Sequence, residues 1–185
     1  MIPIFPRALR LFSLVFFVAL ACVAQQMTVY TAKVIPAISH SGGTTTVRIQ
    51  IASWTTDAER AQIKEAFANG QEKGIAFLHS MAKGYISVAG QAGRKIFAAF
   101  MLESPNSKRL VIVTEHVLSE YEKTQNARVE DYPLTIAKIQ FDPKGHPESG
   151  QVYPATKVSV TADGFVDVQT QDQNTATMID IIRAN

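Results

Sequence analysis

The chain has 185 residues, with 18 lysines and arginines, 16 aspartates and glutamates, and a single cysteine. We expect residues 1–24 to be removed as an export signal. Because this segment carries Arg7, Arg10 and no acid, 16 basic and 16 acidic side chains remain. A balanced, cysteine-free mature chain gives no charge-based indication of nucleic-acid binding, and it excludes disulfides, thiol catalysis and cysteine metal sites.

The N-terminal segment has the three-part pattern of a secretory signal peptide. Arg7 and Arg10 precede an apolar run over residues 11–21, and small residues follow it. The run ends in polar residues before it reaches the length of about 20 apolar residues that a membrane-spanning helix needs. We therefore predict a periplasmic or secreted protein without a membrane span, in which residues 25–185 form one domain.

Cys22 leaves two cleavage positions open for this signal. Cleavage after Ala24 would remove the cysteine, and the small residues before this position fit an ordinary signal peptidase. Cleavage after Ala21 would instead leave Cys22 as the lipid-bearing first residue of a membrane-anchored lipoprotein. Ala19 and Leu20 stand in the reverse of the order usual before a lipoprotein cysteine, so cleavage after Ala24 is favoured.

The first two predicted elements form a β-hairpin. In "TTTVRIQIASW", apolar Val47, Ile49 and Ile51 alternate with polar residues, as in a strand with one buried face. The preceding "TVYTAKVI", residues 28–35, is separated from it by the turn-forming "SHSGG". We expect the two runs to pair as antiparallel strands.

The next segment predicts a helical hairpin. Thr56, followed three residues later by Glu59, is a capping box, which indicates the start of a helix. An apolar stripe with helical spacing continues until Asn69 and Gly70, a pair that favours a helix end. A second helical stretch runs from there to Gly84. The two helices are expected to pack together and to cover one side of a sheet.

After the helices the chain alternates between strand-like runs and turn-forming segments such as "GQAG", "SPNS", "DPKG" and "TADG". The predicted strands are "YISVA", "KIFAAFMLE", "RLVIVTE", "LTIAKIQF", "TKVSV" and "FVDVQ". The final run "TMIDIIR" is either a last strand, which is favoured, or a short helix. Two of them, "KIFAAFMLE" and "RLVIVTE", are apolar on both faces. This pattern indicates a core on one side of the strand and a cover on the other.

These elements predict an α+β fold. We expect an antiparallel β-sheet of about eight or nine strands, curled into a barrel or half-barrel, with the helical hairpin inserted after the second strand as its cover. A two-layer β-sandwich with the same hairpin is the alternative. The connection over residues 115–133 is long for a hairpin loop and is either a binding loop or a short surface helix.

Two long segments carry a resemblance. "GYISVAGQAGRKIFAAFMLESPNSKRLVIVTEHVL" and "YPLTIAKIQFDPKGHPESGQVYPATKVSV" are similar to segments of small exported bacterial proteins best represented among Acidobacteria. The shared features are a strand pair before two helices, an "RLVIVT"-like strand, a "DPKG"-like turn and a "PATKV"-like segment. The resemblance implies export and a common fold, and it implies no activity, site or cofactor.

The chain offers few candidate catalytic residues. It has four histidines but no HExxH, HxH or GxSxG motif, so no metal site, cofactor or serine nucleophile is predicted. If the protein is an enzyme, the candidates are Glu115 and His116, which follow an apolar strand, and His79, on the second predicted helix. We assign no catalytic residue from the sequence.

We expect a non-enzymatic exported protein that binds an apolar or amphiphilic small ligand inside the curved sheet, because two strands are apolar on both faces. A filled core without a ligand is an equal alternative. An envelope interaction or scaffold module that uses an exposed strand edge is another, followed by a small hydrolase or isomerase. The ligand-binding residues and the oligomeric state stay open at this level.

Overall fold

A computed structural model gives the structure of the protein. It describes residues 27–35, 43–89, 92–105, 107–115, 133–161, 166–170 and 175–184. The predicted signal peptide with Cys22 and its cleavage site lies outside these ranges, as do His116 and the connection that follows it up to residue 132. Within the described ranges, no helix is long and apolar enough to cross a membrane.

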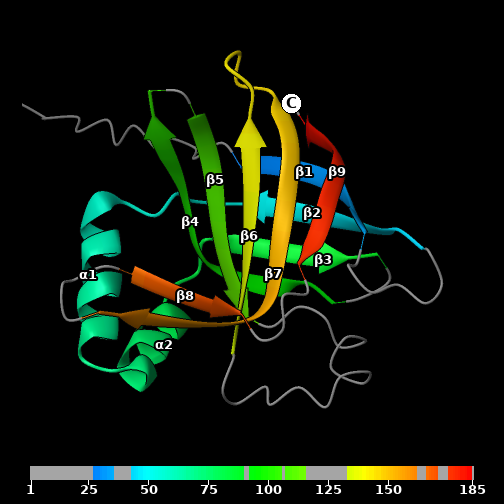
Figure 1. The fold of residues 1–185 in the computed structure, drawn as a ribbon. Helices are drawn as coiled ribbons and strands as arrows, with labels where there is room; N and C mark the ends of the chain where they lie inside the picture. Colours follow the sequence, from blue (N-terminus) through cyan, green and yellow to red (C-terminus); the bar gives the residue numbers. More distant parts are fainter. Residues whose placement is uncertain are drawn as a thin grey trace, which may run out of the picture.

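The described residues form nine strands and two helices (Figure 1). In chain order these are β1 (Thr28–Ile35), β2 (Thr45–Ile51), α1 (Asp57–Ala68), α2 (Gln71–Ser80), β3 (Gly84–Val88), β4 (Arg94–Ser104), β5 (Ser107–Glu115), β6 (Leu134–Phe141), β7 (Pro147–Val160), β8 (Val166–Thr170) and β9 (Ala176–Ala184). The predicted helical hairpin after the second strand and the predicted last strand are therefore confirmed.

The strands pair in one antiparallel sheet that closes on itself. Their order is β6-β5-β4-β3-β2-β1-β9-β7-β8, and an additional pairing of β6 with β7 closes a barrel from all of these strands except β8. In this barrel, β4 to β7 cross β1 to β3 at a steep angle (Figure 1). The predicted α+β barrel is confirmed, and the sandwich alternative is wrong.

Apolar side chains fill the interior of the barrel. Leu110 and Ile112 of β5, Ile139 of β6 and Met178 of β9 have an exposed fraction of 0%. They belong to one continuous cluster to which each of the barrel strands contributes. The inward faces of the barrel strands therefore form a continuous buried apolar core.

The outward side chains of β4, β5 and β6 form a second apolar cluster with the helices. Phe97 and Ala98 of β4 and Leu134 of β6 are buried against Phe67 of α1 and Leu78 of α2. The two-sided apolar character of "KIFAAFMLE" and "RLVIVTE" therefore has the predicted cause. One face of each strand packs inside the barrel, and the other packs under a cover.

The capping box fixes the start of α1 as predicted. The Thr56 hydroxyl accepts a hydrogen bond from the Glu59 amide at 3.2 Å, and the Thr56 amide donates to the Glu59 carboxylate at 2.8 Å. The second helix ends at Ser80 rather than at Gly84, because Gly84 is the first residue of β3 and pairs with Ile51. A Cβ at Gly84 would lie 1.9 Å from the Gln50 carbonyl oxygen, so only glycine fits there.

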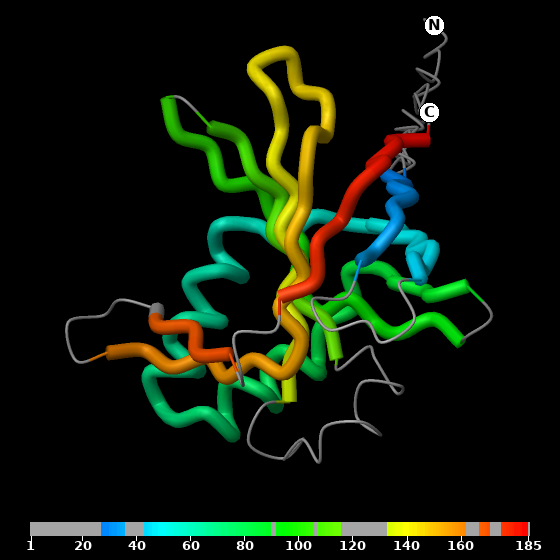
Figure 2. Tube along the Cα trace, turned by 45° about the vertical axis from the view of Figure 1, so that its right-hand side comes forward, coloured from blue at the N-terminus to red at the C-terminus, as the bar shows by residue number. Residues whose placement is uncertain are grey.

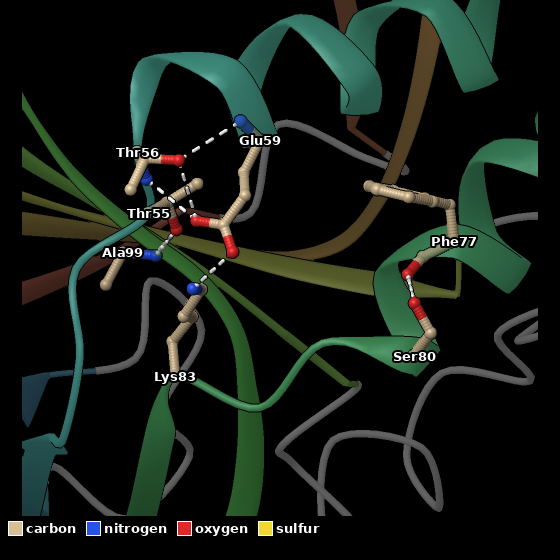
Figure 3. A network of polar contacts seen from close by, with 7 residues as sticks. All are labelled: Thr55, Thr56, Glu59, Phe77, Ser80, Lys83 and Ala99. Carbon is tan, nitrogen blue, oxygen red and sulfur yellow. Dashed lines mark hydrogen bonds and ion pairs between the residues drawn. The ribbon is translucent and has the colours of Figure 1, made fainter.

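Polar contacts tie the start of α1 to the barrel (Figure 3). The Thr55 hydroxyl accepts a buried hydrogen bond from the Ala99 amide at 2.9 Å, and the Thr55 amide donates to the Ala99 carbonyl at 2.8 Å. The Lys83 ammonium lies 2.7 Å from the second oxygen of the Glu59 carboxylate, with the lysine side chain 11% exposed. These contacts hold the N-terminal end of the helix against β4.

β7 is longer than predicted from the sequence. Only "TKVSV", its last five residues, was expected to form a strand. The strand begins at Pro147 and passes through a β-bulge at Pro154 and Ala155, where Ala155 has a φ of 50°. A bulge bends a strand and is one of the few places where a sheet accepts proline. Beyond it, β7 leaves the barrel, pairs with β8 and packs beside α1 (Figure 2).

Candidate binding groove

A groove of about 440 Å³ lies outside the barrel, between the outer face of β4, β5 and β6 and the cover made by the helices, the end of β7 and β8. This volume falls in the range of small-molecule sites in proteins. It is lined by Arg60, Ile63, Lys64, Phe67, Leu78, Ala98, Phe100, Leu102, Val111, Val113, Leu134, Ile136, Lys138, Val158, Val160 and Val168. All of these residues are apolar except three cations, and none is acidic.

Two rows of facing residues across β4, β5 and β6 form the floor of the groove. The first row, the Lys138 row, is Phe100, Val111 and Lys138, and the second, the Ile136 row, is Ala98, Val113 and Ile136. Within each row, the backbone register places the three residues opposite one another on adjacent strands. Because side chains alternate between faces along a strand, all six point away from the barrel interior.

One face of α1 forms a wall of the groove. Arg60, Ile63, Lys64 and Phe67 line it, and their spacing of three, four and seven residues places them on one side of a helix. The Arg60 guanidinium lies 5.5 Å from the centre of the Phe100 ring, so the first turn of α1 stands over the Lys138 row. Asp57, one turn earlier, forms an ion pair with Arg60.

The groove has a buried end and an exposed end. At the buried end, Leu134, Leu78 and Phe67 are 0%, 2% and 5% exposed. At the other end, Leu102 of β4 is 43% exposed. A ligand would therefore meet buried apolar surface at one end and solvent-accessible surface at the other.

Lys138 is the most unusual residue of the lining. Its ammonium lies 4.5 Å from the centre of the Tyr153 ring, a cation–π contact, and it has no carboxylate partner among the described residues. Burial lowers the pKa of Lys138, and the nearby charge of Arg109 lowers it further. Arg109 itself donates a hydrogen bond to Gln140, the residue opposite it on β6. Arg109 and Lys138 therefore lie on the same outer face of the sheet.

The candidate catalytic residues do not form a site within the part of the chain that the structure describes. His79 lies exposed on α2, where its ring stacks on Phe97 at 4.7 Å between centres. Glu115 is the last residue of β5, paired with Leu134, and no hydrogen bond or ion pair joins it to His79. His116 lies outside the described residues.

The groove offers apolar surface and cationic side chains. The described residues that line it include no serine, cysteine, histidine or carboxylate that could act as a nucleophile or general base. Among the described residues, no group of three histidine, cysteine, aspartate or glutamate side chains is placed to hold a metal ion. The arrangement can enclose an apolar group and place cations beside it.

Sequence reasoning did not single out Arg60, Lys64 or Lys138, although two signals were present. In "LTIAKIQF" the outward positions are Leu134, Ile136 and Lys138, so a lysine continues an apolar face. In α1 the two cations fall on the same helical face as the apolar stripe. Neither signal identifies a groove by itself, because a long cationic side chain at the edge of an apolar face is usually directed to solvent.

Comparison of this chain with protein-family models, with curated proteins and with solved structures gave no match.

Proposed function

We propose that this is a non-enzymatic, exported protein that binds an apolar or amphiphilic small molecule in the groove outside the barrel. The observation that carries this proposal is the groove itself: about 440 Å³ of space with an almost wholly apolar lining, next to a barrel whose interior is filled. Space of this kind costs dispersion contacts and exposes apolar surface when it is empty. A bound ligand would supply the missing contacts and cover the apolar surface.

The walls of the groove support binding because they are held in place without a ligand. The paired hydrogen bonds between Thr55 and Ala99 and the contact of Glu59 with Lys83 fix α1 at one side. The bulge at Ala155 directs β7 across the other side. A preformed site loses little conformational entropy on binding, so more of the contact energy appears as affinity.

Native mass spectrometry tests this function directly. We expect purified protein to carry a co-purifying small molecule that organic solvent extracts, or to bind added decanol with one ligand per chain. Val113→Phe on the groove floor should weaken decanol binding about tenfold or more, because the larger ring occupies the space. Ile182→Phe is the matched control, since Ile182 is 63% exposed on β9 and does not line the groove.

Thermal unfolding of both variants separates a filled groove from a damaged fold. If Val113→Phe unfolds near the wild-type temperature and no longer binds, the groove is the site. A wild-type protein without a co-purified molecule and without decanol binding would refute the proposal. Equal binding by the wild type and Val113→Phe would place the ligand elsewhere.

Export is part of the proposal and rests on the sequence of residues 1–24. The mass of the mature protein after fractionation of the producing cells tests it. A chain beginning at Gln25 is expected, in a periplasmic or secreted fraction. A chain beginning at a lipid-modified Cys22 in the membrane fraction would support the lipoprotein alternative, and an intact N-terminus in the cytoplasm would refute export.

A further inference from the structure

Three cations line the groove, and a fourth, Arg109, lies in the row next to Lys138. Lys138 stands at the β6 end of the Lys138 row, and Arg60 lies over the Phe100 ring at the β4 end of the same row. Arg109 occupies the adjacent row, opposite Gln140, and contributes to the electrostatic environment of Lys138. Lys64 follows Arg60 by one helical turn on the same face of α1. Asp57 forms an ion pair with Arg60, whereas the described residues that line the groove include no acidic side chain.

The apolar end of the groove lies at a defined distance from these cations. Along β6, the outward positions run from Lys138 through Ile136 to Leu134, and Leu134 is fully buried. Four residues of an extended strand span about 13 Å. An occupant with one charged end and one apolar chain would lie along β6, with its chain over Ile136 and its end at Leu134.

The charge of Lys138 indicates the sign of that charged end. An ammonium next to apolar groove residues has lost part of its hydration, and a neighbouring guanidinium raises the free energy of its charged form. The Tyr153 ring offsets this only in part, because a cation–π contact is weaker than an ion pair with good geometry. An anion beside Lys138 would supply the carboxylate-like partner that this ammonium does not have among the described residues.

We infer that the ligand of the groove is an anionic amphiphile, with its head group at Lys138 and its single apolar chain directed along β6 toward Leu134. This inference rests on the proposed function, because it requires that the groove binds a small molecule. Decanoate represents the class, and its apolar chain has a length suited to the distance between Lys138 and Leu134.

Isothermal titration calorimetry with three ligands of equal chain length tests the inference. Decanoate, decanol and decylamine, each below its micelle concentration, present an anionic, a neutral and a cationic head. We expect wild-type protein to bind decanoate about tenfold more tightly than decanol, with decylamine weakest. Higher ionic strength should weaken decanoate binding and leave decanol binding nearly unchanged.

Lys138→Gln should lower the affinity for decanoate about tenfold and leave the affinity for decanol within twofold of wild type. Lys138→Arg should restore most of the preference for decanoate. Lys144→Gln is the control, because Lys144 is an exposed cation in the β6–β7 turn and does not line the groove. A general effect of net charge would change both lysine-to-glutamine variants alike.

The outcomes separate the inference from the function on which it rests. If decanol and decanoate bind equally, or if Lys138→Gln loses affinity for both, the groove binds ligands and the anionic-head inference is wrong. If none of the three ligands binds to the wild type, the proposed function fails and the inference fails with it. Tighter binding of decylamine than of decanoate would reverse the assigned charge.

Discussion

β5 places Leu110 and Ile112 in the barrel interior and Val111 and Val113 on the floor of the groove, so neighbouring residues in one strand serve two different environments. The inner face is closed by the strands around it, and its side chains are 0% exposed. The outer face is covered by one helical hairpin and one bent strand, and a groove remains between them.

The difference between the inner and outer faces of β5 shows that apolar composition alone does not produce a closely packed core. A closed barrel forces inward side chains from all sides to interdigitate, and close packing follows. A cover that is fixed at α1 and at the β7 bulge can approach the sheet only as far as these attachments allow. The outer face of β4, β5 and β6 is therefore the side on which open space remains.

The largest expected effect is a loss of stability, and it is tested by replacing one isoleucine on each face of the sheet. Ile112→Ala should destabilise the protein by about 2–5 kcal/mol, because it opens a cavity in a closed interior. Ile136→Ala, on the groove floor and 5% exposed, should cost about 2 kcal/mol, close to the loss of apolar burial alone. Urea denaturation of both variants measures the difference. Equal costs would mean that the two faces are packed alike.

Gly74→Ala should have the next largest effect, in the cover. A Cβ at Gly74 would lie 2.4 Å from ring atoms of Phe67, where α2 packs closely on α1. Overpacking costs about 1–3 kcal/mol, and the better helix propensity of alanine offsets up to about 1 kcal/mol of it. Because Phe67 and Leu78 line the groove, decanol binding should also change. Unchanged stability and unchanged binding would show that the helices adjust freely.

Thr56→Ala should cost about 1 kcal/mol, because it removes the side-chain cap of α1. For a chain of this length the melting temperature should fall by about 2–4 °C. Thr55 and Lys83 still hold the helix against the barrel, so decanol affinity should stay within about twofold of wild type. A large loss of binding with normal thermal unfolding would show that the cap shapes the groove rather than stabilising the fold.

The smallest expected effect is the pH dependence that Glu59 confers on the cover. Its hydrogen bond with Lys83, and then that from the Thr56 amide, lowers the pKa of Glu59 below its ordinary value of 4.5. The folded state therefore gains stability above pH 4.5 and loses it as the pH falls through the lowered pKa. Glu59→Gln keeps a capping box, and its stability difference from wild type should shrink toward pH 3. A difference independent of pH would exclude this contribution.

The sequence by itself determined the local elements. The period-two pattern of Val47, Ile49 and Ile51 identified β2, and Thr56 with Glu59 identified the start of α1. These predictions held because each depends on residues within a few positions of one another. The two-sided apolar pattern of β4 and β5 also indicated that a cover exists, since both faces of a strand must be removed from water.

Only the tertiary structure decided how the barrel closes and where the space lies. β1 pairs with β9 from the other end of the chain, and no local pattern encodes which strands meet at such a distance. The sequence near Pro154 argues against a strand, yet the bulge there turns β7 across the cover. Lys138 became a groove residue only when the sheet register placed it beside Val111, because cross-strand neighbours are set by pairing and not by sequence position.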